Sequence, residues 1–153
     1  FPTRRSSDLD IAARVKEYDR LGAKAISIVT APSFEGQNEW ITEAVKHTKL
    51  PILRKDFISS EDDLKQTRDL GAHWVLLLAD YLQPAELDNL TFHTWRIGLQ
   101  PVIEVQSLAA VKKLQHADAN HVVATEGQSS CIGRLPATSS GNTGNPRAAH
   151  ANA

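Results

Sequence analysis

Two oppositely charged residues at the ends of apolar, strand-like runs are the best candidates for acid and base chemistry. Lys55 closes the run Pro-Ile-Leu-Arg-Lys, and Glu104 lies in the run Pro-Val-Ile-Glu-Val. Side chains alternate along a strand, so Lys55 shares a face with Leu53, and Glu104 shares a face with Val102. An ammonium and a carboxylate that face one cavity can divide acid and base roles near neutral pH. The alternatives are two solvated charges, or a simple ion pair between them.

Apolar and acidic residues near the same strand ends are the next candidates. Phe34 and Phe57 lie just past strand ends, where an aromatic ring either caps the core or forms a wall for a flat ligand. Position alone favours capping. Leu76 lies on the strand between the two charged ones and is expected in the core. Asp80 follows that strand and either reaches the site or caps a helix. The six histidines show no metal-binding spacing, so the sequence predicts no metal site.

The elements that must position these residues alternate between strands and helices. Apolar runs predict strands at 25–29, 51–54, 74–79, 102–105 and 121–124. Helical spacing, caps and glycine stops predict helices at 11–21, 39–46, 60–71, 84–97 and 108–115. This order is typical of βαβ units around a parallel sheet. The absence of a glycine-rich nucleotide-binding turn favours a barrel over an open doubly wound sheet. A complete eight-stranded barrel needs about 250 residues. The predicted fold class is therefore α/β, a partial (β/α)8 barrel with about five parallel strands.

Composition describes an ordinary soluble globular protein of 153 residues, with 41% hydrophobic residues, 23% charged residues and a net charge of -1. This balance gives no reason to expect nucleic acid as a partner, and no run reaches the roughly 18 apolar residues of a membrane span. The single Cys131 excludes an internal disulfide and makes a structural zinc site improbable. A reducing, cytoplasmic location fits these features.

Three segments are predicted along the chain. Residues 1–10 form a leader that does not match the pattern that follows and looks non-native. Residues 11–125 form the partial barrel domain. Residues 126–153 form a polar tail without apolar periodicity, for which we predict disorder.

The motifs together resemble the indole-3-glycerol phosphate synthase family. They are Ile-Leu-Arg-Lys-Asp-Phe at 52–57, Phe-x-Gly at 34–36, Gly-Ala at 71–72 and Val-Ile-Glu-Val at 102–105. The resemblance covers about residues 11–124. It implies an enzyme of tryptophan biosynthesis, a carboxy-lyase that closes the ring of carboxyphenylamino-deoxyribulose 5-phosphate with loss of carbon dioxide and water. The implied partner is that small phosphorylated, anthranilate-derived substrate, and no cofactor or metal is implied.

The resemblance also implies roles for individual residues. Lys55 corresponds to the general acid that protonates the substrate carbonyl, and Glu104 to a glutamate that assists later proton transfers. Phe34, Phe57 and Leu76 fall where the family packs the aromatic ring of the substrate.

The sequence departs from the family pattern at both ends. A glutamate and a lysine of the family's first strand have no counterpart upstream of residue 11, and Thr125 and Gly127 stand where an asparagine and an arginine are expected. The phosphate-binding glycines and serine have no counterpart in 127–153. These departures predict an inactive gene fragment. The alternatives are a non-catalytic partial barrel that self-associates through exposed edges, or another phosphate-binding barrel such as phosphoribosylanthranilate isomerase.

Overall fold

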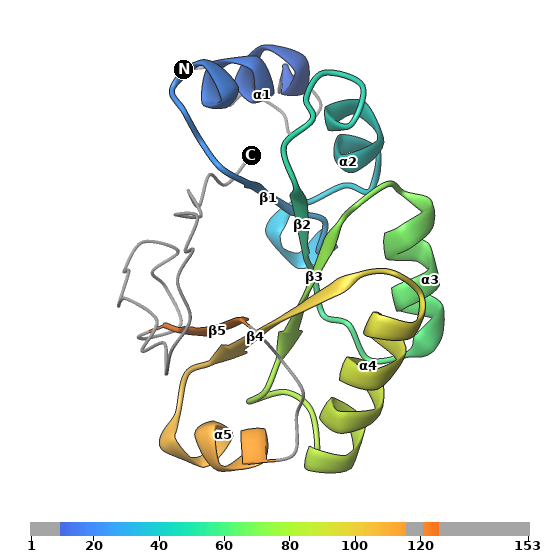
Figure 1. Cartoon of the computed structure of the whole chain (residues 1–153), viewed down its shortest axis with the longest axis vertical. Coiled ribbons are helices and arrows are strands. Elements are labelled where there is room, and N and C mark those ends of the chain that lie inside the picture. Colours follow the sequence, from blue (N-terminus) through green and yellow to red (C-terminus); the bar gives the residue numbers. More distant parts are fainter. Residues whose placement is uncertain (1–9, 116–120, 126–153) are drawn as a thin grey trace.

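A parallel five-stranded sheet forms the centre of the molecule, as the sequence predicts (Figure 1). The computed structural model describes residues 10–115 and 121–125. The strands are β1 (Ile26–Val29), β2 (Ile52–Lys55), β3 (Trp74–Leu78), β4 (Gln100–Val105) and β5 (His121–Ala124), adjacent in that order. The helices are α1 (Ile11–Arg20), α2 (Glu39–Ala44), α3 (Glu61–Asp69), α4 (Pro84–Arg96) and α5 (Leu108–Lys112). Short 3₁₀ turns occupy Pro32–Phe34 and Lys113–Gln115.

Local sequence signals set where the helices begin and end. Ser60 and Ser107 cap α3 and α5 through side-chain hydrogen bonds to the backbone. Gly71 and Gly98 follow α3 and α4 with φ of 94° and 83°, a conformation that favours glycine. The sequence did not predict the 3₁₀ turn at 32–34. The predicted ends of α2 and α5, at residues 46 and 115, lie two and three residues beyond the observed ends, because helices often finish in tighter turns.

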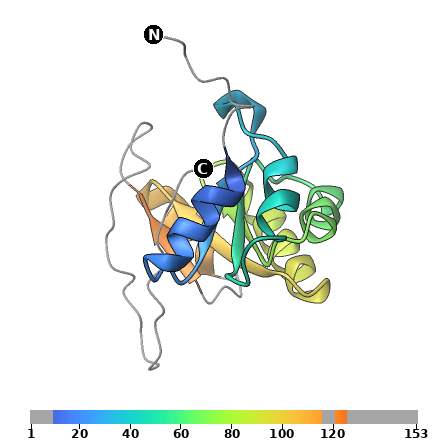
Figure 2. The ribbon, with the colours of Figure 1, turned by 90° about the horizontal axis from the view of Figure 1, so that it is seen from above.

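The helices cover one face of the sheet, which is the arrangement of a barrel wall. Strands that are consecutive in sequence are neighbours in space, and crossovers of one hand between them place every connecting helix on the same side. Figures 1 and 2 both show α2, α3 and α4 on one flank of the strands. An open doubly wound sheet would instead carry helices on both faces.

Two apolar clusters fill the space between sheet and helices. Leu77 and Ile103 pack against residues of α3, α4 and α5 in one cluster, while Ile28 and Ile52 pack against α1 and α2 in the other. A third, smaller cluster of Leu53, Leu76 and Val102 lies on the opposite, inner face of the sheet. The alternation of strand side chains thus separates a helix-covered face from an inner face.

The predicted leader and tail fall almost wholly outside the described residues, and the predictions made for them stay predictions. Asp10, the last residue of the predicted leader, caps α1 by accepting a hydrogen bond from the Ala13 backbone N–H at 2.9 Å. None of the helices within 10–115 and 121–125 has the length and apolar character needed to cross a membrane.

Candidate active site

Lys55 and Glu104 lie on the same face of the sheet, near the ends of their strands. The side chain of Lys55 points to the face opposite that of its neighbour Arg54, which is buried on the helix side of the sheet. The side chain of Glu104 likewise points away from that of Ile103, which belongs to the helix-side core. Both charges therefore project to the inner face, beside Leu53 and Val102 of the inner cluster. Each charged side chain is half-buried. This is the arrangement that the sequence predicted.

The two charges stand apart and do not form an ion pair with each other. Strand β3 separates β2 from β4, so the strands that carry them are about 10 Å apart. Leu78 pairs with Glu104 in the β3–β4 register, and Leu76 pairs with Val102. Leu76 is 5% exposed and forms the apolar floor between the charges. Within the described residues, no hydrogen bond or ion pair reaches the Lys55 ammonium.

The Glu104 carboxylate is held by two donors on one of its oxygens. Glu104 Oε1 accepts hydrogen bonds from Thr125 Oγ1 at 2.8 Å and from Gln106 Nε2 at 3.0 Å. Thr125 is the residue found where the family pattern predicts an asparagine, and its hydroxyl makes a polar contact in the site. Gly127, the other departure, lies outside the described residues. The second oxygen of Glu104 receives no hydrogen bond from the described part of the chain, which leaves it available to a ligand.

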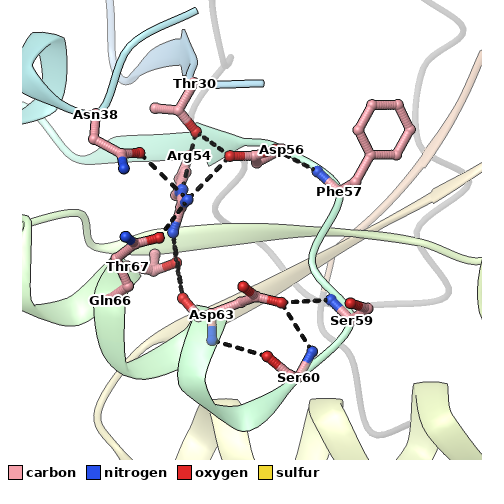
Figure 3. Close-up of polar contacts among 10 residues, drawn as sticks. All are labelled: Thr30, Asn38, Arg54, Asp56, Phe57, Ser59, Ser60, Asp63, Gln66 and Thr67. Atoms are coloured by element: carbon pink, nitrogen blue, oxygen red, sulfur yellow. Dashed lines mark hydrogen bonds and ion pairs between the residues drawn. The ribbon is translucent and has the colours of Figure 1, made fainter. Parts of the chain in front are cut away.

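Behind Lys55, the buried Arg54 organises a polar network on the helix side of β2 (Figure 3). Arg54 is 3% exposed. Its guanidinium donates to side chains of α3 and of the loops around β2, at the following distances: Thr30 2.9 Å, Asn38 3.3 Å, Asp56 3.0 Å, Gln66 2.9 Å and Thr67 2.9 Å. It also donates to the Asp63 carbonyl at 3.3 Å. A buried guanidinium with this many partners is satisfied, which a buried charge requires.

Asp56 extends this network to the residue after Lys55. Its Oδ2 accepts hydrogen bonds from Arg54 and from the Thr30 hydroxyl, the latter at 2.6 Å, and its Oδ1 accepts from the Phe57 backbone N–H at 2.8 Å. Arg54 and Asp56 thus anchor the chain on both sides of Lys55. The backbone that carries the Lys55 side chain is held in place from the opposite face of the sheet.

Asp63, at the start of α3, has a lowered pKa. Burial opposes its ionisation, but hydrogen bonds from the Ser59 and Ser60 backbone and from the Ser60 hydroxyl outweigh this and lower the pKa of the carboxyl below its ordinary value. Asp63 Oδ2 lies 3.0 Å from both backbone nitrogens. This capping box fixes the entry to α3, the helix that supplies Thr67 to the Arg54 network.

The two candidate aromatic residues are exposed and follow the ends of β1 and β2. Phe34 is 65% exposed and Phe57 is 44% exposed, and their rings lie 6.3 Å apart at an angle of 17°. The core-capping interpretation, which position alone favoured, is therefore wrong. Gly36 explains how Phe34 reaches this place: a Cβ at residue 36 would lie 2.6 Å from the Thr30 carbonyl carbon, so only glycine lets the loop fold back over the end of β1.

Sequence reasoning missed two kinds of contact in the site. It treated Arg54 as part of a strand motif and gave it no role, although an arginine in an apolar strand beside polar residues of the following helix is a signal of a buried network. It also left Asp80 open between the site and a helix cap. The Asp80 carboxylate instead accepts from the Gln106 backbone N–H at 2.7 Å and from the Ser107 hydroxyl at 2.6 Å, joining two loops. Within the described ranges, no group of three or more potential ligands could hold a metal ion.

Comparison with known proteins assigns this arrangement to a family. The family model described as "Indole-3-glycerol phosphate synthase" matches residues 4–123. The chain belongs to the indole-3-glycerol phosphate synthase family. The relative from Campylobacter curvus, named indole-3-glycerol phosphate synthase, is 40% identical over 106 residues, or 69% of this chain and 41% of that protein. The relative of the same name from Geobacillus thermodenitrificans is 33% identical over 108 residues, or 70% of this chain and 42% of that protein.

The chain spans less than half the length of these curated relatives. The match confirms the resemblance inferred from the motifs and favours this family over phosphoribosylanthranilate isomerase. Among solved structures, the tryptophan synthase alpha chain from Legionella pneumophila is similar with a TM-score of 0.44 and 11% identity, covering 74% of this chain and 66% of that one.

Proposed function

We propose that this protein acts in tryptophan biosynthesis by closing the indole ring of carboxyphenylamino-deoxyribulose 5-phosphate, with loss of carbon dioxide and water. The observation that carries the proposal is the placement of Lys55 and Glu104 on the inner face, above the apolar floor of Leu76, in a chain of the indole-3-glycerol phosphate synthase family. A positive group and a carboxylate about two strands apart leave room for a substrate between them.

The proposed roles follow from the charges and contacts of the two residues. The Lys55 ammonium, which has no partner within the described residues, protonates the substrate carbonyl oxygen as the aromatic carbon attacks the carbonyl carbon. The carbonyl oxygen later leaves as water, and the carboxylate on the ring leaves as carbon dioxide. Glu104, held through Oε1, uses its other oxygen in the proton transfers that follow. Phe34, Phe57 and Leu76 pack against the aromatic ring.

The proposal extends to partner and location. The ligand is a small phosphorylated molecule, and a phosphorylated substrate is retained inside the cell because its charge prevents passage through a membrane. We therefore propose that the protein works in the cytoplasm without nucleic acid or membrane as a partner.

A chimaera tests the proposed roles directly. Residues 11–125 would replace the equivalent segment of the Campylobacter curvus relative, and formation of indole-3-glycerol phosphate would be followed by its fluorescence. We expect activity that falls by at least about 10²-fold in Lys55→Ala and in Glu104→Gln. A Lys65→Ala variant is the control, because Lys65 is a solvent-exposed lysine on α3 that pairs with Asp62. A folded, active chimaera that tolerates Lys55→Ala would refute the role of Lys55.

A second candidate function concerns the chain as given, because β1 and β5 are the outer strands of the described sheet. Exposed strand edges pair readily with other strands. We propose that a chain without turnover would self-associate through these edges. Sedimentation velocity over a series of concentrations, combined with the ring-closure assay on the purified chain, separates the two candidates. A silent chain that forms larger species supports association, and a monomeric chain at all concentrations excludes it.

A further inference from the structure

A third aromatic residue, Tyr81, lies against the two candidate substrate-binding rings. Its ring centroid is 5.6 Å from that of Phe57 at an interplanar angle of 60°, an edge-to-face contact. Phe57 in turn lies against Phe34. The three rings come from three successive loops after β1, β2 and β3, all at the end of the sheet where Lys55 lies.

All three rings remain accessible although each contacts another. Tyr81 is 57% exposed, against 65% for Phe34 and 44% for Phe57. Neighbouring aromatic side chains that are not buried in a core present a continuous apolar surface to solvent, which is the usual sign of a binding site. The rings follow β1, β2 and β3 at the end of the sheet that carries Lys55, so the ligand of the proposed function contacts both the rings and the ammonium.

The loop that presents Tyr81 is fixed on both sides. Asp80 is tied to the loop after β4 through its bonds with Gln106 and Ser107. On the other side, Lys113 Nζ donates to the carbonyl oxygens of Ala79 at 2.8 Å and Leu82 at 2.9 Å. The Tyr81 backbone N–H donates to the Leu78 carbonyl at 3.0 Å. Because these bonds hold the backbone of the loop, the loop loses little conformational freedom on binding, and such preorganisation favours affinity.

We propose that Tyr81 is a specificity-determining residue that forms, with Phe34 and Phe57, the recognition surface for the planar carboxyphenyl ring of the ligand. The inference rests on the proposed function and extends it to a residue outside the family motifs. The contribution comes from the Tyr81 ring, because its contact with Phe57 is made by the ring, and no hydrogen bond joins its hydroxyl to another described residue.

Equilibrium binding of anthranilate to the full chain tests the inference without requiring turnover. Binding would be measured by saturation-transfer NMR and by the change in anthranilate fluorescence. We expect Tyr81→Ala to raise the dissociation constant about three- to tenfold, and Tyr81→Phe to change it less than about twofold. Phe92→Ala is the matched control, because Phe92 has the same 57% exposure but lies on α4. The control should bind as the original chain does.

The other outcomes of the binding experiment separate the role of Tyr81 from that of the aromatic surface and from the proposed function. Unchanged binding in Tyr81→Ala, together with weaker binding in Phe57→Ala, overturns the role of Tyr81 and leaves the proposed function in place. Unchanged binding in Tyr81→Ala, Phe57→Ala and Phe34→Ala alike, or no binding by the original chain up to the solubility limit of anthranilate, overturns the aromatic surface itself. An active chimaera would then still support the roles of Lys55 and Glu104. Urea midpoints of the variants would show that each one folds.

Discussion

Replacing Arg54 by methionine should strongly destabilise the chain, because it removes the centre of the buried network behind Lys55. Methionine keeps much of the length of the side chain but has no donors. Arg54 makes six hydrogen bonds, and its ion pair with Asp56 joins side chains that are 4% and 14% exposed. After the substitution, the Asp56 carboxylate is a poorly solvated charge without its cation.

The size of the effect follows from which groups lose all their partners. Asp56 still accepts from Thr30 and from the Phe57 backbone, and Thr67 still donates to the Asp63 carbonyl at 2.7 Å. Breaking a buried ion pair by removing one partner costs about 3–5 kcal/mol of stability. Because these bonds remain, we expect Arg54→Met to lower the free energy of unfolding by about 3 kcal/mol, at the low end of that range. Arg54→Lys should cost less, since an ammonium supplies three of the donors but cannot reproduce the planar fork.

Urea unfolding followed by tryptophan fluorescence measures this loss, provided that the slope with denaturant stays constant. Arg20→Met is the control for removing one positive charge. Arg20 pairs with Glu17 on the surface of α1, with side-chain exposures of 69% and 50%, and its loss should leave the midpoint close to its original value. The double variant Arg54→Met/Asp56→Asn also removes the stranded carboxylate, so it should be at least about 1 kcal/mol more stable than the sum of the single variants predicts.

Two results would refute this reasoning. If Arg54→Met lowered the free energy of unfolding by less than about 1 kcal/mol, the guanidinium would not be the centre of a buried network. If the double variant were as unstable as the sum of the single variants, the destabilisation would not arise from an uncompensated Asp56 charge.

Three further predictions concern the loop, the capping box and the core. Gly36→Ala should destabilise the chain by about 1–3 kcal/mol and weaken anthranilate binding by displacing Phe34; an unchanged urea midpoint would contradict the 2.6 Å approach at residue 36. Because folding lowers the pKa of Asp63, its ionised form stabilises the folded chain above its unfolded pKa, and this stabilisation is lost as pH falls through the folded pKa. Asp63→Asn should therefore flatten the loss of stability below about pH 5, and parallel pH profiles of the urea midpoint would show that the carboxylate has no such role. Leu77→Ala, at a fully buried site, should cost about 2–5 kcal/mol, whereas Leu108→Ala, at a site 83% exposed, should change stability by less than about 0.5 kcal/mol; similar midpoints for the two would argue against the packing described.

The order and type of the elements could be read from the sequence because local chemistry determines them. The uninterrupted apolar run at 74–78 is typical of a strand buried on both faces, and Ser60 and Ser107 do cap helices. The placement of Lys55 and Glu104 on one face also follows locally, from the alternation of side chains along each strand. These features depend on a few adjacent residues, and all of them agree with the structure.

The contacts that support the site could not be read in the same way. Arg54 binds partners that lie between 2 and 24 positions away in sequence, and no local pattern says which of them come together. The link from Asp80 to Ser107 spans 27 positions. The exposure of Phe34 and Phe57 depends on how three loops fold over one another, which a position after a strand does not determine. Side-chain networks of this kind require the tertiary structure.

Two basic residues of different chemistry stand next to each other on β2, one facing the helices and the other facing the ligand side. A slip of β2 by a single residue would exchange the positions of these two side chains. The lysine ammonium, with three donors, would then face the acceptors that now bind the guanidinium of Arg54, and the arginine would point to the inner face of the sheet. Insertions or deletions within residues 52–56 should therefore destabilise the fold even where the apolar pattern is preserved. The difference in donor number and geometry between a guanidinium and an ammonium at neighbouring positions thus helps to fix the register of β2 in the sheet.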